Sequence, residues 1–583
     1  MRGKRPVDLA VLAFFLLLVV WTLAPVLRAG AFQAVPTRDV EFGRSLSEGQ
    51  TSLRLADLTF YTWLSARNAR TLLSDPVGIF NAEICAPTEK SLALSAPGLT
   101  LGFLGIPGFL LSDDPAFTYN TAVGAMLLLA AFAMYLLIAE WTGSRSAGVI
   151  AGLFYGFHAV RLDLLLWAAE IDTTWAVFAL LFSRRLFERG RTRDAVWLGL
   201  ACCLQMATSF YSFLAAATLA GCFLPWLLKT HGLRQVQVKQ LAGLALGIGA
   251  FALFLYSPYF ELREGGDLFD RGFRAPMPLS AYLPGQAYFF GLTLWILAGV
   301  GLIRGQSGLA RESPGDPRWP LGVAALATAL LAASWSLDYQ LKALWPESPL
   351  SIPDFFDLAA QVLPGLENIR VISLMASGVH LGACVFAGIG AAAVLRTTAL
   401  STRPVSAAAS LVALITLEIV LPYQPGWTAG GRLEAVDIRP SSEAIAFAKE
   451  LGRIAPPGAI LELPFDHAGG STVVFGPERV LLSYYHQRRT SGCYGSYSPQ
   501  GRQELAQATR APIDRATLES LRRQGFETLV LHRRDQVSHG YASNFEALAR
   551  DRDLQLLIET PDKVAYAILP SDETQGSTKH ETR

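Results

Sequence analysis

An acidic residue beside an aromatic run is the first feature of this sequence that could do chemistry. Asp57 opens the segment DLTFYTWL at 57–64, which follows the first strongly apolar stretch of the chain. In an amphipathic helix at a membrane surface, such a carboxylate can face a cavity at the bilayer boundary. The alternative interpretation is a helix N-cap, because aspartate is a favoured capping residue.

A second group of ionisable residues interrupts an apolar region at 158–172. It contains His158, Arg161, Glu170 and Asp172. Ionisable groups at membrane depth are costly, so their presence indicates function. Glu170 and Asp172 together with Asp57 would suit Mg²⁺ or Mn²⁺, which prefer oxygen ligands. Two alternatives stay open: the loop lies in water, or Arg161 pairs with Glu170.

Arginines near the ends of apolar runs could bind a phosphate. Arg370 precedes such a run, and a guanidinium can hold a phosphate through two hydrogen bonds. Arg263, Arg271 and Arg274 lie in another loop on the same expected side. The alternative for Arg370 is an interfacial arginine that extends its charge toward water.

Aromatic and basic residues cluster near the C-terminus, at Tyr484, Tyr485, His486, Arg488, Arg489, Tyr494 and Tyr497. Aromatic faces with polar tips suit sugar rings, and arginines suit anions. We expect His158, Tyr485 and Tyr494 to contact an acceptor or a sugar. Two alternatives remain: a structural hydrogen-bonding role for His158, and an ordinary polar loop for the cluster.

The elements that must position these groups are membrane helices. Of the 583 residues, 51% are hydrophobic and only 17% are charged, as in membrane proteins. A net charge of +1 offers no basic field for nucleic acid. The stretch 9–27 is too long for a cleaved signal segment and reads as a first span. Ten more apolar runs lie near 117–139, 147–166, 171–187, 195–213, 214–228, 240–259, 285–303, 319–336, 372–395 and 405–421.

The distribution of lysine and arginine predicts the orientation of these eleven spans. The segments assigned to the cytoplasm carry 17 lysines and arginines in 58 residues, and the opposite loops carry few. The first extracytoplasmic loop is expected at 29–116. Within it the stretch 92–111 is broken by prolines and glycines, so we expect a re-entrant or interfacial segment there. The charge distribution places the N-terminus in the cytoplasm. Because the number of spans is odd, residues 422–583 are then expected on the extracytoplasmic side.

The composition turns globular after residue 421. Helices are expected at 443–451, 515–524 and 541–552, and strands at 459–463, 526–532, 554–559 and 564–569. The fold class is thus a polytopic α-helical membrane protein, with a transmembrane domain at 1–421 and a small extracytoplasmic α/β domain at 422–570. The polar stretch 571–583 is expected to be disordered. Six cysteines are too few for a disulfide scaffold, and Cys202, Cys203, Cys222 and Cys384 lie in apolar runs.

An acidic residue in the first outer loop resembles the hallmark of polytopic glycosyltransferases with the C-type fold. Further stretches are similar to one bacterial branch of that group: YGFH at 155–158, SPY at 257–259, LPGLENIR at 363–370 and SGCYGSYSP at 491–499. The resemblance implies a polyprenyl-phosphate-linked sugar donor and an inverting transfer to an envelope glycan, lipid or protein on the outer face of the bacterial inner membrane. It implies that Asp57 is the catalytic base. Arg370, Arg263 and Arg271 would hold the lipid phosphate.

The chain departs from that group in two places. Ala56 stands where the branch usually has glycine, and Val371 and the residues after it replace a proline and a second arginine. Glu170 and Asp172 resemble paired acids that hold a divalent metal in oligosaccharyltransferases, but many C-type enzymes need no metal. Two other classes remain open: a flippase or transporter of lipid-linked glycan, and a non-catalytic envelope-assembly protein.

Overall fold

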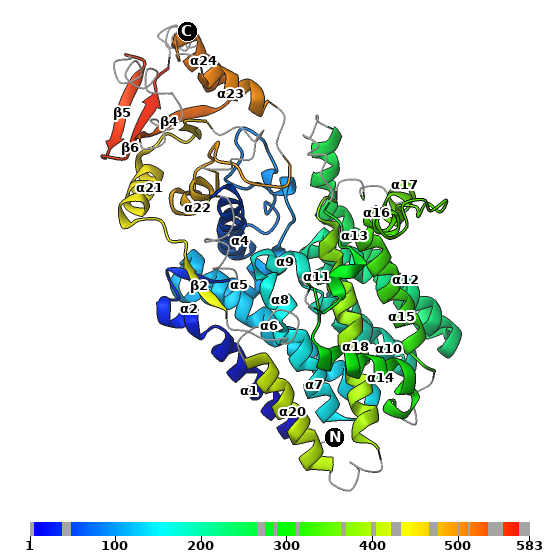
Figure 1. Cartoon of the computed structure of the whole chain (residues 1–583). Helices are drawn as coiled ribbons and strands as arrows, with labels where there is room; N and C mark the ends of the chain where they lie inside the picture. Colours follow the sequence, from blue (N-terminus) through cyan, green and yellow to red (C-terminus); the bar gives the residue numbers. More distant parts are fainter. Residues whose placement is uncertain are drawn as a thin grey trace.

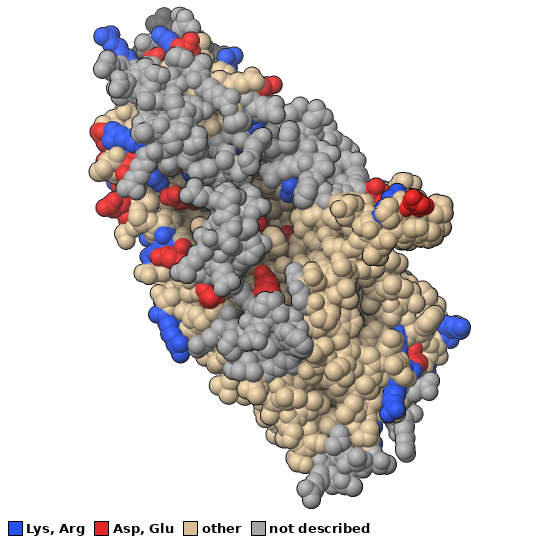
Figure 2. All heavy atoms as spheres, viewed as in Figure 1, with Lys and Arg blue, Asp and Glu red and all other residues tan. Residues whose placement is uncertain are grey.

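The computed structural model describes residues 5–37, 48–264, 275–284, 286, 288–310, 315–362, 366, 369–397, 404–420, 433–465, 476–497, 501–510, 513–533 and 552–570. A bundle of long helices occupies one end of the molecule, and the strands β4, β5 and β6 lie at the other end (Figure 1). The helical part presents a broad surface without charged side chains on the face in Figure 2, as a lipid-facing surface should.

Each of the eleven predicted apolar runs contains a helix. These helices are α1 (Arg5–Thr22), α6 (Pro115–Thr142), α7 (Arg145–Phe157), α10 (Thr174–Arg189), α11 (Thr192–Thr208), α12 (Phe210–His231), α13 (Gln235–Glu264), α14 (Leu292–Gly308), α15 (Arg318–Ala333), α18 (Ala376–Leu395) and α20 (Pro404–Val420). Among the described residues, five helical stretches are long and apolar enough to cross a membrane. A sixth span results if α15 and α16 (Ser336–Leu344), bent by 81°, count as one. The chain is a membrane protein, but the count of eleven spans is not confirmed.

Polar residues inside the apolar runs explain why several helices are short. The run expected at 147–166 breaks at His158, whose ring accepts from the Val160 N–H and caps a new helix. The run expected at 195–213 breaks at Ser209, which caps α12 in the same way. With a rise of about 1.5 Å per residue, the 13-residue α7 is about 20 Å long, less than the thickness of the hydrocarbon core.

The segment 92–111 forms a turn of 3₁₀ helix, η1 (Ser91–Leu94), and a 14-residue helix, α5 (Leu99–Ser112). A β-carbon at Gly102 would lie 2.4 Å from the β-carbon of Asn68, so only glycine allows α5 to pack this closely on the first loop. The helix is shorter than a span needs. The non-crossing assignment of this segment stays a prediction.

Two glycines bring α14 and α18 into backbone contact. A β-carbon at Gly390 would lie 1.9 Å from the Leu297 carbonyl oxygen, and one at Gly301 would lie 2.0 Å from the Phe386 carbonyl oxygen. Neither carbonyl can move without disturbing its own helix. The small residues of these two helices therefore serve helix packing.

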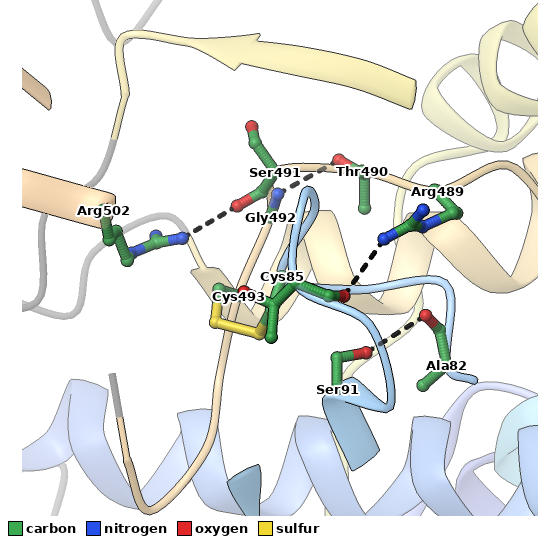
Figure 3. Close-up of a disulfide and its surroundings, with 10 residues drawn as sticks. Ala82, Cys85, Ser91, Arg489, Thr490, Ser491, Gly492, Cys493 and Arg502 are labelled. Carbon is green, nitrogen blue, oxygen red and sulfur yellow. Dashed lines mark hydrogen bonds between the residues drawn. A yellow bond between two sulfur atoms is a disulfide. The ribbon is translucent and has the colours of Figure 1, made fainter. Parts of the chain in front are cut away.

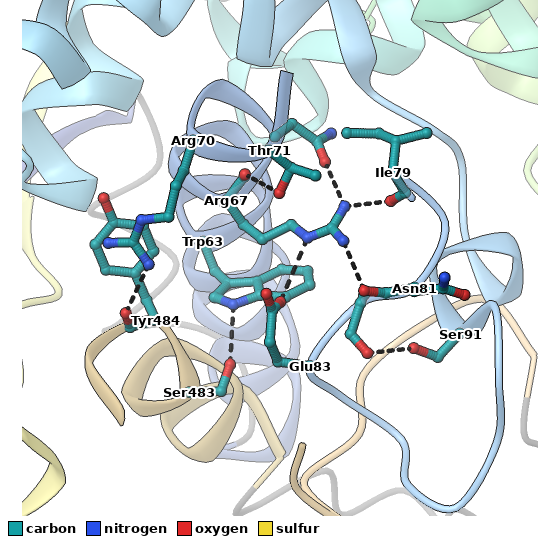
Figure 4. Close-up of polar contacts among 12 residues, drawn as sticks. Trp63, Arg67, Arg70, Thr71, Ile79, Asn81, Glu83, Ser91, Ser483 and Tyr484 are labelled. Carbon is teal, nitrogen blue, oxygen red and sulfur yellow. Dashed lines mark hydrogen bonds and ion pairs between the residues drawn. The ribbon is translucent and has the colours of Figure 1, made fainter. Parts of the chain in front are cut away.

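The first loop contains the longest buried helix outside the bundle, α4 (Glu48–Ser74). Its Arg67 is buried and holds residues 79–83 against the helix (Figure 4). The guanidinium donates to Glu83 Oε2 at 3.3 Å, to the Asn81 carbonyl at 2.9 Å and to the Ile79 carbonyl. These bonds fix the start of the loop that carries Cys85.

The C-terminal region, residues 433–570 as described, contains a four-stranded sheet and four helices. Its elements are β2 (Glu434–Asp437), α21 (Ser442–Ile454), β3 (Ala459–Leu463), α22 (Gly476–His486), α23 (Arg502–Arg510), α24 (Arg515–Arg523), β4 (Phe526–His532), β5 (Leu554–Glu559) and β6 (Lys563–Ile568). The strand order is β3-β4-β6-β5, with β3 and β4 parallel and the other pairs antiparallel. β3 and β4 have both faces covered, because Leu461 packs on the side of α24 and Ile460 on the side of α21.

Most predicted elements of this region are present. β3, β4 and β5 have the predicted bounds, and β6 and α24 differ by one residue. The helix predicted at 541–552, except its last residue, and the tail 571–583 lie outside the described residues. The domain division at 421 stays a prediction.

The C-terminal region is attached to the first loop by a second, two-stranded sheet. β1 (Ala34–Thr37) pairs antiparallel with β2, so the chain after the first helix meets the chain after α20. The remaining elements are α2 (Ala24–Ala29), α8 (Ala159–Asp163), η2 (Leu165–Trp167), α9 (Ala168–Ile171), η3 (Leu279–Tyr282), α17 (Phe355–Val362) and η5 (Ile372–Met375).

Candidate active site

Asp57 lies within α4, as its tenth residue, and its carboxylate is held on both oxygens. The Trp167 indole N–H donates to Oδ2 at 2.9 Å, and the Tyr494 hydroxyl donates to Oδ1. The side chain is half-buried. Because α4 begins at Glu48, the N-cap interpretation of Asp57 is wrong.

Tyr494 reaches Asp57 because a disulfide fastens its segment to the first loop. Cys85 and Cys493 form the bond, across 408 residues of sequence (Figure 3). The Cys85 amide also donates to the Gly492 carbonyl at 2.9 Å. The phenol ring of Tyr494 then packs against Phe60, with ring centroids 5.3 Å apart. The residue before Tyr494 is therefore covalently fixed to the loop that follows α4.

Glu170 is a second carboxylate, and its charge and that of Asp57 both act on Tyr61. Tyr61 lies one turn after Asp57 on α4 and donates to Glu170 Oε1 at 2.6 Å, while Ser209 donates to Oε2. Burial, followed by the charges of Glu170 and Asp57, raises the pKa of Tyr61 well above its ordinary value. The phenol thus stays protonated and remains a donor to Glu170.

Asp172 points into a different set of partners. Its Oδ1 accepts from the buried Arg161 guanidinium at 2.7 Å and from the Thr174 N–H at 3.1 Å. Arg161 also lies over the Tyr155 ring, 4.9 Å from its centroid. The alternative in which Arg161 pairs with Glu170 is therefore wrong, because the Arg161 guanidinium pairs with the Asp172 carboxylate.

These contacts do not fit the Mg²⁺ or Mn²⁺ site considered from the sequence. Asp172 is already paired with a guanidinium, and both oxygens of Glu170 accept hydroxyl protons. No group of three histidine, cysteine or acidic side chains converges anywhere in the described part of the chain. We therefore derive no step through a metal.

Arg370 lies two residues before η5, next to the Tyr211 hydroxyl. The adjacent Val371 N–H donates to the Tyr211 hydroxyl at 3.3 Å, and the charges of Arg370 and Glu170 both act on that hydroxyl. The guanidinium is half-buried. Arg370 and Glu170 therefore both lie close to the Tyr211 hydroxyl. The side chain of Arg263 and all of Arg271 and Arg274 lie outside the described residues.

Two predicted contact residues are not part of this cluster. His158 is fully buried, with Nδ1 accepting from the Val160 N–H and Nε2 2.9 Å from the Phe290 carbonyl oxygen. These contacts give His158 the structural hydrogen bonds of the alternative interpretation, and a sugar or acceptor role for it stays a prediction. Tyr485 packs edge-on against Tyr484 on α22, and the charges acting on its hydroxyl are those of Asp114, Arg439 and Asp113. Of the three predicted contacts, only Tyr494 joins the carboxylate.

Sequence reasoning missed four members of the cluster: Trp167, Tyr61, Ser209 and Tyr211. Only Tyr61 had a usable signal, since it is four residues after Asp57 and so on the same helix face. The disulfide also had a signal in the sequence, because Cys85 and Cys493 are the two cysteines outside the apolar runs. The others depend on how the outer loops fold together.

The sequence matches no family model and no curated protein. Solved structures of two glycosyltransferases are similar to this chain at low sequence identity and with TM-scores below 0.5. The arabinofuranosyltransferase AftD from Mycobacteria is 15% identical with a TM-score of 0.48. This match covers 90% of this chain and 42% of the AftD chain. ArnT from Cupriavidus metallidurans, in its apo state, is 15% identical with a TM-score of 0.39. This match covers 97% of this chain and 98% of ArnT. Its undecaprenyl phosphate complex is 13% identical, covering 98% of both chains with a TM-score of 0.40. The chain thus spans less than half the length of AftD.

Proposed function

We propose that this protein transfers a sugar from a polyprenyl-phosphate donor to a hydroxyl group of an envelope glycan, lipid or protein, with inversion at the anomeric carbon. The observation that carries the proposal is the Tyr494 hydroxyl on Asp57 Oδ1, opposite the Trp167 bond to Oδ2. The Trp167 indole fixes Oδ2 of Asp57, while Oδ1 is within reach of a hydroxyl group. General-base catalysis needs this arrangement.

In the proposed reaction, the acceptor hydroxyl replaces that of Tyr494 on Oδ1 and gives its proton to Asp57. Its oxygen forms a bond to the anomeric carbon, while the bond from that carbon to the phosphate oxygen breaks. The electron pair leaves with the polyprenyl phosphate. Attack opposite the leaving group inverts the anomeric configuration.

Arg370 and Glu170 have supporting roles in this proposal. The Arg370 guanidinium would stabilise the charge on the leaving phosphate through charge-assisted hydrogen bonds. Glu170 holds Tyr61 by a hydrogen bond and so fixes the α4 face that presents Asp57. Neither role requires Glu170 to exchange a proton.

We place the site on the extracytoplasmic side of a bacterial inner membrane, with the N-terminus in the cytoplasm. The Cys85–Cys493 disulfide supports this orientation, because disulfides persist in oxidising compartments. A reporter fused after Arg583 should be extracytoplasmic, and one fused at Arg189 should be cytoplasmic. A cytoplasmic C-terminus would refute the orientation.

The substitution Asp57→Asn tests the proposal. It preserves the size of the side chain but removes the basic oxygen, so transfer should fall by about 10²–10⁴. The assay is release of undecaprenyl phosphate by purified protein from a panel of undecaprenyl-phosphate-linked sugars, alongside modification of envelope glycan in cells. The matched control is Asp113→Asn, an outer aspartate that pairs with Arg70 and should keep its activity. Full activity of Asp57→Asn would falsify the assignment of the base.

A further inference from the structure

The chain between α15 and α18 contains two short helices, α16 and α17, that project from the side of the helical bundle (Figure 1). α16 begins at Ser336, shortly after the end of α15, and the axes of these two helices differ by 81°. We call residues 334–362, which contain α16 and α17, the lateral segment. The sharp bend means that α16 runs across the direction of α15.

The length of α15 places this bend near a boundary of the membrane. Its 16 residues give a length of about 24 Å, compared with about 30 Å for the hydrocarbon core. α15 begins at Arg318, whose guanidinium pairs with Asp316, and such a charged pair is least costly at the boundary of that core. For a helix along the membrane normal, the other end of α15 then lies about 6 Å inside the opposite boundary. Because α16 is almost perpendicular to α15, it lies nearly parallel to the membrane plane at this depth.

The lateral segment exposes large apolar side chains, as α15 does. On α15 the exposed residues Trp319, Val323 and Leu326 share one helix face, which suits contact with lipid. In the lateral segment, Tyr339 is 68% exposed and Leu344 is 87% exposed. The other exposed apolar side chains of the segment are Trp335, Trp345, Leu350, Leu358 and Val362. Contiguous apolar surface of this kind marks a site of interaction, and tryptophan and tyrosine are typical of membrane interfaces.

Hydrogen bonds within the lateral segment fix its shape. The Ser334 hydroxyl donates to Asp354 Oδ2 at 2.7 Å, across the bend and the connection to α17. Asp338 accepts from Lys342 Nζ at 2.6 Å and from the Ile352 N–H at 2.9 Å. Both acids therefore have partners inside the segment, and its shape does not depend on a second protein.

Charged and apolar side chains occupy different sides of α16. At about 100° per residue, Tyr339, Ala343 and Leu344 fall within an arc of about 140°, and Asp338 and Lys342 lie outside that arc. In Figure 2, charged atoms gather on the upper part of the projection, toward the end of the molecule that holds β4, β5 and β6. The surface below them is uncharged and adjoins the uncharged surface of the bundle. A helix in a membrane interface has this division into a polar and an apolar side.

We propose that the lateral segment lies in the headgroup region of the bilayer, with Tyr339, Leu344 and Trp345 in contact with the acyl chains. An interfacial helix buries its apolar face by about 5–10 Å, which matches the depth given by the length of α15. The occupant of this surface is thus the surrounding lipid, and the bilayer continues from the exposed face of α15 onto α16.

The depth of the lateral segment also bears on Arg370. Phe356 of α17 packs in one apolar cluster with Ile369 and Ile372, which lie on either side of Arg370 in the sequence. The segment therefore helps to set the depth of Arg370. If Arg370 holds the donor phosphate, as the proposed function requires, the donor meets it at the level of the lipid phosphates, without leaving the bilayer.

Electron paramagnetic resonance of spin labels tests the depth of the segment. The full-length chain, with its free cysteines Cys202, Cys203, Cys222 and Cys384 replaced by alanine, is labelled at one new cysteine at a time in lipid nanodiscs. Molecular oxygen concentrates in the bilayer and a nickel chelate stays in water, so the more effective of the two relaxing agents reports the surroundings of the label. In Leu344→Cys and in Tyr339→Cys, oxygen should relax the label more than the chelate does.

Leu556→Cys is the matched control. Leu556 is an exposed leucine of β5, at the end of the molecule remote from the bundle, so the chelate should be the more effective agent there. If the chelate is also the more effective agent at Leu344 or at Tyr339, the proposal is overturned and a protein partner becomes the candidate cover of this surface. The readout does not involve transfer activity, so its failure is distinguishable from failure of the proposed function.

Discussion

Replacing both Cys85 and Cys493 with serine removes the covalent link between the first loop and the C-terminal region. The bond joins residues 408 positions apart, for which the chain-entropy expression gives about 6 kcal/mol. The membrane helices between the two cysteines stay folded when this junction opens, so the loop is not a free chain. We therefore expect a loss nearer to 2–4 kcal/mol, the typical range for a disulfide.

Backbone hydrogen bonds should keep the junction assembled in the double variant. The Thr490 amide donates to the Glu83 carbonyl at 2.7 Å, and the Ser496 amide donates to the Leu94 carbonyl at 2.8 Å. The protein should thus fold but melt at a lower temperature, by roughly 5–15 °C for a region of this size. Amide hydrogen exchange in 490–497 should accelerate, and transfer activity should fall as Tyr494 and its segment leave α4.

The assay is thermal unfolding of the purified protein in detergent, with and without a thiol reductant. Reductant should lower the melting temperature of the unaltered protein to that of the double variant and leave the variant unchanged. Cys222→Ser, in α12, is the control and should keep its response to reductant. An unaltered melting temperature and exchange rate in the double variant would show that the disulfide does not hold this junction.

Three further changes have defined outcomes. Arg370→Ala should weaken undecaprenyl phosphate binding by about 10- to 100-fold in a titration, with Arg370→Lys restoring part of it; unchanged affinity would redirect attention to the arginines of 263–274. Burial lowers the pKa of His486 to about 4, below the value of about 6.5 in the unfolded chain, so the unfolded state binds more protons and stability falls as the pH drops from 6.5 to 4. The part due to His486 should reach about 3 kcal/mol and be missing in His486→Asn, while the buried His532, whose pKa is also lowered, keeps its own contribution; equal pH dependence of both melting temperatures would contradict this. Gly390→Ala places a β-carbon 1.9 Å from the Leu297 carbonyl oxygen and should lower the free energy of unfolding by more than the usual overpacking penalty of roughly 1–3 kcal/mol. The control Gly247→Ala has nothing within 4 Å of the new β-carbon and should keep its melting temperature.

The sequence predicted elements best where the local pattern determines them. β3 and β4 are short apolar runs between polar residues, and both have the predicted bounds. Helix ends inside the apolar runs were harder, because a single polar side chain decides them. His158 was considered as a sugar contact, but its ring caps α8, and nothing in the spacing distinguishes those roles.

The candidate site shows the same division between local and long-range information. Asp57 and Tyr494 were each identified from their residue type and surroundings. They are 437 positions apart, and no local pattern indicates that they meet. The N-cap alternative for Asp57 failed because α4 starts nine residues earlier, in a polar segment without a helical apolar pattern.

The long separation of the two cysteines also determines when this protein can finish folding. The partner of Cys85 is synthesised 408 residues later, which at about 5–20 residues per second is a delay of roughly 20–80 s. During that interval the first loop has neither its disulfide nor the strand β2 that pairs with β1. Cys85 must remain a reduced thiol, and the apolar face of α4 that later contacts α22 is uncovered. A ribosome that stops anywhere between these two positions therefore leaves a membrane-inserted chain with an open site, which quality-control proteases can recognise.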